Sequence, residues 1–176
     1  DPSLGVMVAV HVGLCSMTIA LSGNETQKEK YLPKLASGEF LGAYSLSEAG
    51  SGTDAAAMVA KATDDGDCYT LNGEKMWVTN GTTADLFVLF AKVTDHPDYG
   101  KKSHGGVTCF IIEKGFEGFE IGKKEDKLGI RSSDTCTLIL NNCKVPKENV
   151  LGEVGKGFPI AMNALDNSRI GIAAQG

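Results

Sequence analysis

The chain has 176 residues with an ordinary hydrophobic content of 42% and 22 glycines. Its formal net charge of −5 provides no general basic surface, which argues against nucleic acid as the main partner. The five cysteines contain no C-x-x-C pair and the three histidines lack the spacing of metal ligands, so neither a disulfide framework nor a metal site is expected. The chain starts at Asp1 and ends at Gly176 inside a helical pattern, so we expect an internal segment of a longer protein.

Two helices are expected in the first 39 residues. Residues 4–21 are almost entirely apolar, a borderline length for a membrane span, but His11 and several small residues interrupt the run. We therefore interpret this stretch as a buried core helix, with no membrane span, and His11 as a core histidine with satisfied hydrogen bonds. Asn24 and Gln27 have the spacing of a capping box for a second helix, which Pro33 is expected to break or kink.

From Phe40 the sequence changes to the alternating pattern of strands. Asn72-Gly73 is typical of a two-residue hairpin turn, and residues 96–106 form a polar loop. Residues 144–146 are expected to leave the sheet, and a helix is expected from Phe158 onward. The strands are expected at residues 41–45, 58–63, 68–71, 74–79, 86–93, 107–113, 119–123 and 135–141.

The order of these elements predicts an α+β protein. Short strands separated by glycine-containing turns favour an antiparallel β-barrel or sandwich, and the absence of β–helix–β alternation between residues 40 and 150 argues against a Rossmann fold. We expect three parts: the end of an N-terminal helical domain at residues 1–39, a middle β domain at residues 40–152, and the start of a C-terminal helical domain at residues 153–176.

Three stretches contain residues suited to binding chemistry. Residues 44–54 end in a turn of glycines and small hydroxyls, whose exposed donors suit a phosphate or a polar ring edge, although most such turns only reverse the chain. Strand alternation places Trp77 and Thr79 on one face, a pattern that suits either a flat heteroaromatic ligand or a protein core. Asp166 and Arg169 lie three residues apart on a helix, as an anion-binding pair or as a surface ion pair.

Five motifs follow one another along the chain. They are Tyr44-Ser45-Leu46-Ser47-Glu48 with Gly50-x-Gly52-Thr53-Asp54, Trp77-Val78-Thr79-Asn80-Gly81, Gly122-Lys123-Lys124-Glu125-Asp126-Lys127-Leu128-Gly129-Ile130-Arg131, Val145-Pro146-x-x-Asn149-Val150-Leu151-Gly152 and Asp166-x-x-Arg169-Ile170-Gly171-Ile172-Ala173. In this order they resemble the acyl-CoA dehydrogenase family over essentially the whole chain. Residues 123–129 and 169–175 are most similar to short-chain, butyryl-type members. Ala49 departs from a frequent proline, and Thr53 replaces the commoner serine but keeps the hydroxyl.

The resemblance implies a middle β domain between two helical domains, with FAD at their junction. It implies that Leu46 and Ser47 bond the edge of the flavin, that Trp77 packs beside the isoalloxazine, and that Thr79 donates to flavin N5. Gly52 and Thr53 would lie near the flavin and the CoA phosphates. The implied FAD contacts are Tyr44, Leu46, Ser47, Gly52, Thr53, Trp77, Val78 and Thr79, and the implied acyl-CoA contacts are Thr53, Ser103, Asp166 and Arg169, with no metal ligand.

The implied reaction is the α,β-dehydrogenation of an acyl-CoA thioester. A carboxylate base removes the α proton while the β hydrogen leaves as hydride to flavin N5. Some branched-chain members carry the base immediately before the Arg of Asp-x-x-Arg, but that residue is Ser168 here. We therefore expect the base to lie beyond Gly176, no catalytic residue within the chain, and no turnover by the chain alone.

The resemblance also implies an electron-transfer flavoprotein as electron acceptor, a homo-oligomer, usually a tetramer, and an intracellular location in the bacterial cytoplasm or the mitochondrial matrix. Two other functions stay open. One is an oxygen-using acyl-CoA oxidase on the same fold, which relative reoxidation rates with oxygen and with other acceptors would identify. The other is a non-catalytic FAD/CoA-binding or scaffold module, which a lack of bound flavin in the full-length protein would favour.

Overall fold

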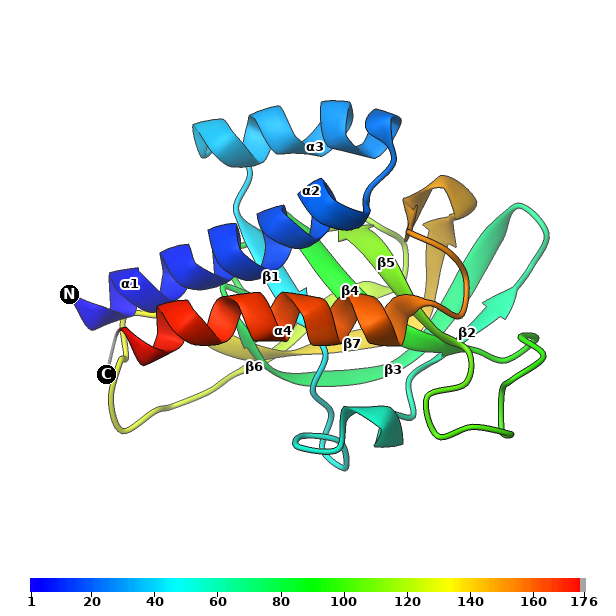
Figure 1. Cartoon of the computed structure of the whole chain (residues 1–176). Coiled ribbons are helices and arrows are strands. Elements are labelled where there is room, and N and C mark those ends of the chain that lie inside the picture. The colour runs from blue at the N-terminus through cyan, green and yellow to red at the C-terminus, as the bar shows by residue number, and fades with distance from the viewer. Residues whose placement is uncertain (175–176) are drawn as a thin grey trace.

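The computed structural model describes residues 1–174 and consists of helices packed on one side of a curled sheet (Figure 1). The helical elements are α1 (Pro2–Val8), the π-helical η1 (Ala9–Ser16), α2 (Met17–Ser22), α3 (Glu25–Ser37), the 3₁₀ turns η2 (Ala55–Ala57) and η3 (Lys147–Asn149), and α4 (Gly157–Ala173). The strands are β1 (Gly42–Ser45), β2 (Lys61–Asp64), β3 (Cys68–Thr79), β4 (Leu86–Val93), β5 (Val107–Glu113), β6 (Phe119–Lys124), β7 (Thr135–Pro146) and β8 (Val150–Leu151).

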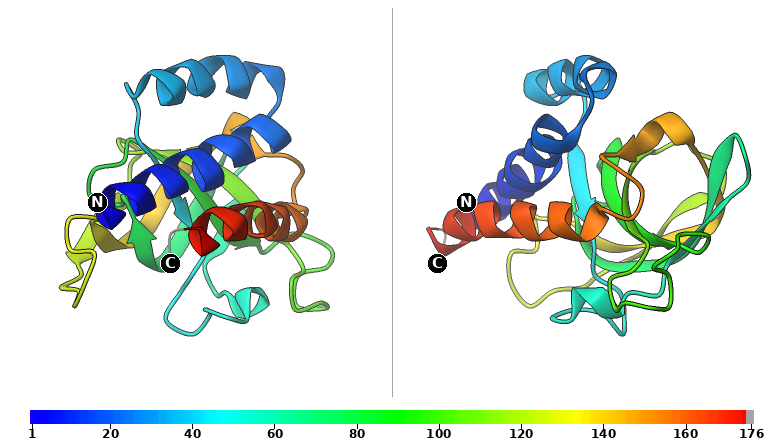
Figure 2. Two further views of the ribbon diagram at one scale, coloured as in Figure 1. Left: turned by 60° about the vertical axis from the view of Figure 1, so that its left-hand side comes forward. Right: turned by 45° about the vertical axis from the view of Figure 1, so that its right-hand side comes forward.

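The eight strands form one sheet with the order β6-β7-β3-β2-β4-β5-β8, and β1 pairs with β4. The right-hand view of Figure 2 shows this sheet curling towards a barrel, with the helices outside it. The expected α+β class is therefore confirmed. The sheet is mixed and not purely antiparallel, because β4 is parallel to both β1 and β2.

Strand β4 is buried on both faces, which explains its continuous apolar sequence. Leu86, Val88 and Phe90 face a cluster shared with the helices, which we call the outer cluster. Phe87 and Leu89 face the inner cluster, which lies inside the curl of the sheet. The apolar runs that predicted β4 and β5 therefore supply the centre of two cores, and both strands have the predicted bounds.

Elements α1, η1 and α2 follow one another without a break and form one continuous helical stretch, Pro2–Ser22. By length and composition alone this stretch would qualify as a membrane span, with 21 residues and a mean hydropathy of 2.1, criteria that a core helix of a globular protein also meets. One face packs against β1 and α4 and buries Val10, Cys15 and Ile19 in the outer cluster. The opposite face leaves large apolar side chains exposed, namely Leu4, Val8, Val12, Met17 and Leu21. The expected buried helix is thus buried on one side only.

The second helix has the predicted start and passes through its proline. The side chain of Asn24 accepts from the backbone N–H of Gln27, and the Gln27 side chain accepts from the backbone N–H of Asn24, which confirms the capping box. The expected break at Pro33 is wrong, because α3 continues to Ser37. Tyr31 and Leu35, on either side of Pro33, are buried in the outer cluster, and this packing stabilises the helical turn that contains the proline.

His11 links three elements, as a core histidine should. Its Nδ1 atom accepts the backbone N–H of Gly42 at 2.9 Å, and its Nε2 atom lies 3.0 Å from the carbonyl oxygen of Leu35. The ring is therefore the neutral Nε2–H tautomer, with both nitrogens satisfied.

The expected hairpin at Asn72-Gly73 is wrong, because β3 runs without a turn from Cys68 to Thr79. At Gly73 (φ 146°) a Cβ atom would lie 2.8 Å from that of Ala60, so the glycine permits a close approach of backbones. The side chain of Asn72 accepts the backbone N–H of Asn142 at 2.9 Å, across an irregularity in the β3–β7 ladder. Tertiary contacts therefore stabilise Asn72-Gly73, a dipeptide that is typical of turns, in the middle of β3.

Strand β7 extends further at its C-terminal end than predicted. Val145 pairs with Tyr69 and Pro146 pairs with Cys68, so residues 144–146 stay in the sheet. Asn142, the residue after the predicted end of the strand, has φ 52° and lies at a bulge within it. The short strand β8 was not predicted.

Candidate functional site

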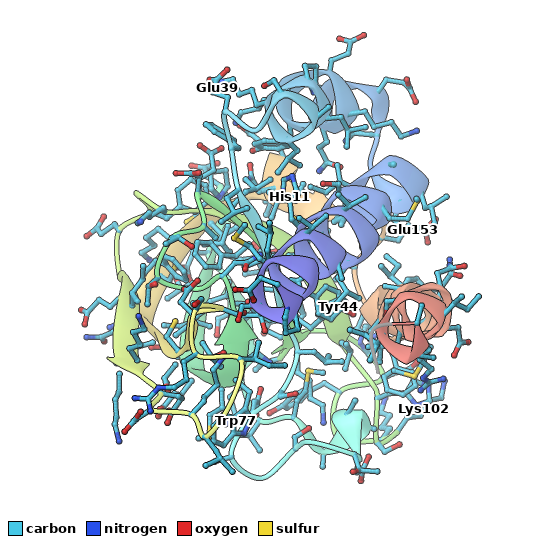
Figure 3. All side chains as sticks on the ribbon, turned by 90° about the vertical axis from the view of Figure 1, so that its left-hand side faces the viewer. His11, Glu39, Tyr44, Trp77, Lys102 and Glu153 are labelled. Atoms are coloured by element: carbon cyan, nitrogen blue, oxygen red, sulfur yellow. The ribbon has the colours of Figure 1, made fainter. Side chains whose placement is uncertain are left out.

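An open pocket of about 390 Å³ lies where β1, β3 and α4 meet the first helical stretch. Figure 3 shows Tyr44 between that stretch and α4. The pocket is lined by Val10, Leu14, Tyr44, Leu46, Ser47, Gly52, Thr53, Asp54, Ala55, Met76, Trp77, Thr79, Phe158, Met162, Leu165 and Arg169. It is of the size and mixed polarity that small-molecule sites have.

The β1 wall is rigid. The Tyr44 ring lies 5.3 Å from the Phe90 ring, and its hydroxyl donates to the carbonyl oxygen of Ala161 at 3.4 Å, which connects β1 to α4. Burial raises the pKa of Tyr44 well above its ordinary value, so the phenol stays protonated. Leu46 follows on the same wall and is also buried.

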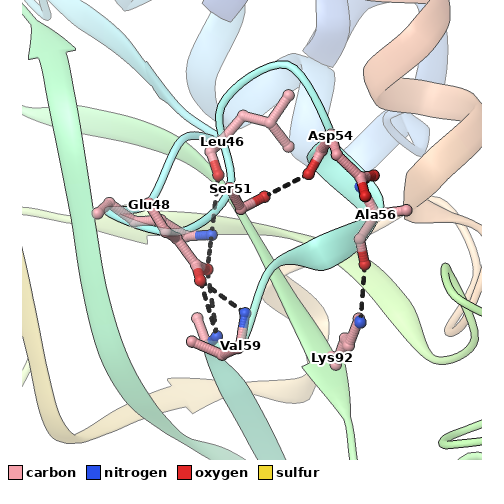
Figure 4. A network of polar contacts seen from close by, with 9 residues as sticks. Leu46, Glu48, Ser51, Asp54, Ala56, Val59 and Lys92 are labelled. Atoms are coloured by element: carbon pink, nitrogen blue, oxygen red, sulfur yellow. Dashed lines mark hydrogen bonds and ion pairs between the residues drawn. The ribbon is translucent and has the colours of Figure 1, made fainter.

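A tight loop presents the small polar residues of the second wall. Glu48 and Ser51 exchange two backbone hydrogen bonds, at 2.9 and 3.1 Å, and the Ser51 hydroxyl donates to the carbonyl of Asp54 at 2.8 Å (Figure 4). These bonds hold the turn closed from behind, so that Gly52 and Thr53 face outward into the pocket. A Cβ at Gly52 would have no atom within 4 Å, so the space in front of it is free.

The β3 wall depends on a β-bulge. Lys75 pairs with Leu138 and Val78 pairs with Cys136, so Met76 and Trp77 together oppose a single residue of β7. Trp77 has φ 58°, a conformation that costs energy for a bulky residue, and its side chain is 59% exposed at the pocket. Trp77 and Thr79 lie on the pocket face of the strand, as alternation predicts. Lys75 would share that face in a regular strand, but the bulge reverses the alternation before Trp77, and the Lys75 side chain is buried outside the pocket.

Three hydroxyl groups in the pocket are available to a ligand. Within residues 1–174, the side-chain oxygens of Ser47, Thr53 and Thr79 make no hydrogen bond to another protein group, and all three residues line the pocket. An exposed indole beside free hydroxyl donors can hold a flat polar ring by stacking and by edge-on hydrogen bonds.

Helix α4 closes the pocket with residues that sequence reasoning did not select. It approaches closely because Gly157, its first residue, lies against the backbone of Thr108, where a Cβ would come within 2.6 Å. Phe158, Met162 and Leu165 then supply an apolar wall. The only signal for them was the apolar period of the helix, which equally indicates a core face.

Eight of the eleven residues predicted for the two ligands line this single pocket. Val78 does not, because its side chain is buried in the inner cluster. Ser103 lines a separate hollow beside the 96–106 loop. Asp166 is exposed and forms an ion pair with Arg169 at 2.5 Å, and only Arg169 reaches the pocket.

The described part of the chain offers no other obvious chemistry. No group of histidine, cysteine and acidic residues in it could hold a metal ion, and its five cysteines are free thiols. Burial raises the pKa of Cys15 to about 12, which leaves this thiol unreactive. Asp54 is the one acidic residue among the pocket-lining side chains described, and its carboxylate accepts the N–H of Ala56 at the start of η2.

Comparison with known proteins decides the family. The family model described as "Acyl-CoA dehydrogenase, middle domain" matches residues 43–143, and "Acyl-CoA dehydrogenase, N-terminal domain" matches residues 1–39. The chain belongs to the acyl-CoA dehydrogenase family. It is 52% identical to the short-chain specific acyl-CoA dehydrogenase of Clostridium acetobutylicum over 97% of the chain and 44% of that protein. It therefore spans less than half the length of this acyl-CoA dehydrogenase.

Solved acyl-CoA dehydrogenase structures have the same fold. Butyryl-CoA dehydrogenase from Megasphaera elsdenii matches with a TM-score of 0.94 and 48% identity, over 99% of this chain and 45% of that one. The acyl-CoA dehydrogenase of Bacillus anthracis complexed with FAD matches with a TM-score of 0.89 and 44% identity, over 97% of this chain and 28% of that one. In the motif at residues 169–175 that predicted a short-chain member, Gln175 lies outside the described residues.

Proposed function

We propose that the chain supplies part of the FAD and acyl-CoA site of a flavoenzyme that α,β-dehydrogenates short-chain acyl-CoA thioesters. The observation that carries this proposal is the convergence of Leu46, Ser47, Trp77, Thr79 and Arg169, from three distant parts of the chain, on one pocket. Family membership and the similarity to short-chain and butyryl-CoA dehydrogenases support the substrate class.

The pocket has the groups that a flavin ring needs. Trp77 offers an exposed aromatic face, and the free hydroxyls of Ser47 and Thr79 can donate to polar atoms at the edge of the ring. The related Bacillus anthracis protein carries FAD. When bound, FAD would supply the hydride acceptor, and the protein would supply binding, orientation and electrostatics.

The substrate would enter from the side of Thr53 and Arg169. Arg169 is the one cation among the described pocket residues, and its guanidinium suits the anionic CoA part of the substrate. Asp166 would act through its ion pair with Arg169, by orienting the guanidinium. Ser103 stays a candidate CoA contact from the neighbouring hollow.

We propose that the base for the α proton is not among the described residues. Ser168 has no carboxylate, and its hydroxyl donates to the carbonyl of Leu165. Asp54 is the one acidic residue among the described pocket residues, and one oxygen of its carboxylate caps η2. The prediction is that this chain alone does not turn over acyl-CoA.

The remaining features of the proposal concern the whole protein. We propose a division into residues 1–39, 40–152 and 153–176, a homotetramer, an electron-transfer flavoprotein as acceptor, and a bacterial cytoplasmic or mitochondrial matrix location. The apolar face of the first helical stretch, with Leu4, Val12 and Leu21 exposed, suits contact with further helices.

A spectrum of the full-length protein tests the proposal. Bound flavin that loses its oxidised absorbance on anaerobic addition of butyryl-CoA is the expected result. A protein without flavin would support the scaffold alternative, and reoxidation faster with oxygen than with other acceptors would identify an oxidase.

A further inference from the structure

A buried ion pair outside the pocket connects the loop after β1 to strand β3, which form two of the pocket walls. The Nζ atom of Lys75 lies 2.7 Å from Oε1 of Glu48, and the two side chains are 0% and 4% exposed. The same ammonium donates to the carbonyl oxygen of Leu46 at 3.1 Å. Burial lowers the pKa of Lys75, and the charge of Glu48 opposes that shift. Burying two charges costs free energy even when they are paired, so stability alone is a weak reason for such a pair.

The pair connects three separate segments. The Glu48 carboxylate accepts the backbone N–H groups of Val59 and Ala60, at 2.6 and 3.1 Å, which anchors the segment before β2 (Figure 4). Strand β2 begins directly after these two residues, at Lys61, later than the expected start at residue 58. Beside the pair, the backbone N–H of Met76 donates to the carbonyl of Ser47 at 2.9 Å. The pocket loop, β3 and the start of β2 are thus held as one unit.

The pair also lies next to the strained part of the site. Lys75 is the last regularly paired residue before the bulge of Met76 and Trp77. Trp77 is largely exposed and adopts a positive φ, so little burial of its own indole holds it there. Strained conformations persist only where the surrounding structure fixes them. Before Trp77 in the chain, the anchors are the Lys75 ion pair and the Met76–Ser47 hydrogen bond. After it, Val78 is buried in the inner cluster and pairs with Cys136.

We propose that Glu48 and Lys75 are positioning residues for the cofactor pocket. Their ion pair holds the bulge that directs Trp77 into the pocket and fixes the Leu46–Ser47 edge opposite it. The inference rests on the proposed function, because the ligand between these two walls is FAD. Neither charged side chain lines the pocket, so both act through the residues beside them.

The test is a mutant cycle on FAD affinity in the full-length protein. The double variant Glu48→Gln/Lys75→Met removes both charges, and the carbonyl oxygen of the introduced glutamine can still accept from the backbone N–H of Val59. The backbone N–H of Ala60 and the carbonyl of Leu46 lose their closest partners, so a lower unfolding midpoint is expected and FAD affinity is measured well below it. The FAD affinity of the double variant is expected to fall about tenfold, because a pocket wall displaced by a fraction of an ångström binds poorly. Trp77→Ala should weaken FAD binding about tenfold in the wild type and less than about threefold in the double variant, since the pair acts through Trp77.

The matched control is Lys30→Met/Glu113→Gln, which removes an ion pair between α3 and β5, outside the pocket. It should leave FAD affinity unchanged. Equal FAD affinity of wild type and Glu48→Gln/Lys75→Met would overturn the inference, as would an equal effect of Trp77→Ala in both backgrounds. If the double variant does not fold, Lys75→Met alone, in which the Glu48 carboxylate keeps the backbone N–H groups of Val59 and Ala60, is held to the same outcomes. A wild-type protein that binds no FAD would instead refute the proposed function.

Discussion

The hydroxyl of Tyr31 donates to the Oε1 atom of Glu113 at 2.7 Å, and this bond connects α3 to the end of β5. Lys30 approaches the same oxygen at 2.8 Å, and the Asn149 side chain donates to the Tyr31 hydroxyl at 3.2 Å. The N-terminal helical part is therefore held on the sheet by a partly buried polar cluster and not only by apolar packing.

This cluster predicts a pH dependence of stability. Burial acts to raise the pKa of Glu113, but the hydrogen bonds from Lys30 and Tyr31 outweigh it and hold the pKa below its ordinary value. A carboxyl with a lowered folded-state pKa contributes stability above its unfolded pKa of about 4.3, and this contribution is lost as the pH falls through the folded pKa. Glu113→Gln should lower the urea midpoint at pH 7, and the difference from wild type should shrink below about pH 4. The exposed Glu120→Gln serves as control, and a difference that does not vary with pH would contradict the prediction.

The close approach of Gly73 to Ala60 predicts a large effect of a small substitution. Gly73→Ala would place its Cβ 2.8 Å from that of Ala60, in a backbone conformation that side chains rarely adopt. We expect a loss of about 1–3 kcal/mol in the free energy of unfolding, measured by urea denaturation. Gly115→Ala, where no atom lies within 4 Å of the added Cβ, should change it by less than about 0.5 kcal/mol. Equal effects at the two glycines would be incompatible with this packing.

The sequence predicted the fold where local pattern and tertiary packing agree. The strands of Leu86–Val93 and Val107–Glu113 were found because both faces are buried and the whole run is apolar. The prediction of a hairpin at Asn72-Gly73 was wrong because contact with Ala60, a residue distant in sequence, overrides the turn preference of this dipeptide. The prediction that Pro33 breaks the helix was wrong for a similar reason, because the core contacts of Tyr31 and Leu35 keep α3 continuous.

The site was predictable only where a motif carried it. Leu46, Ser47 and Trp77 belong to motifs of the family, and the structure brings them together. Phe158 and Met162 could not be selected, because nothing local distinguishes a pocket-facing apolar residue from a core residue. The role of Lys75 could not be foreseen either, since alternation places it on the face of Trp77 until the bulge is known.

The free hydroxyl of Thr79 predicts a modest contribution to cofactor binding. Thr79→Val keeps the shape of the side chain and removes a donor that has no partner among the described protein groups. One net hydrogen bond contributes about 1 kcal/mol, so FAD affinity should fall about fivefold. Fluorescence titration of the apoprotein with FAD measures this change. Thr63→Val, on the exposed part of β2, should leave the affinity unaltered, and an unchanged Thr79→Val affinity would exclude Thr79 as a cofactor donor.

Arg169 should act on the substrate and not on the cofactor. Its side chain is 70% exposed, so Arg169→Ala is expected to preserve folding and FAD content. Loss of one exposed charge-assisted contact should raise the KM for butyryl-CoA about fivefold. Arg131→Ala, which removes a similar exposed ion pair outside the pocket, is the matched control. A KM that rises equally in both variants, or only in Arg131→Ala, would rule out the assigned role.

The central claim is that the pocket between β1, β3 and α4 holds FAD for acyl-CoA dehydrogenation. The most direct measurement is the visible spectrum of the purified full-length protein, recorded anaerobically before and after addition of butyryl-CoA. We predict a bound oxidised flavin whose absorbance is lost on addition of the substrate, and a weaker flavin signal in Trp77→Ala. A wild-type protein with no flavin, or with a flavin that acyl-CoA does not reduce, would contradict the account.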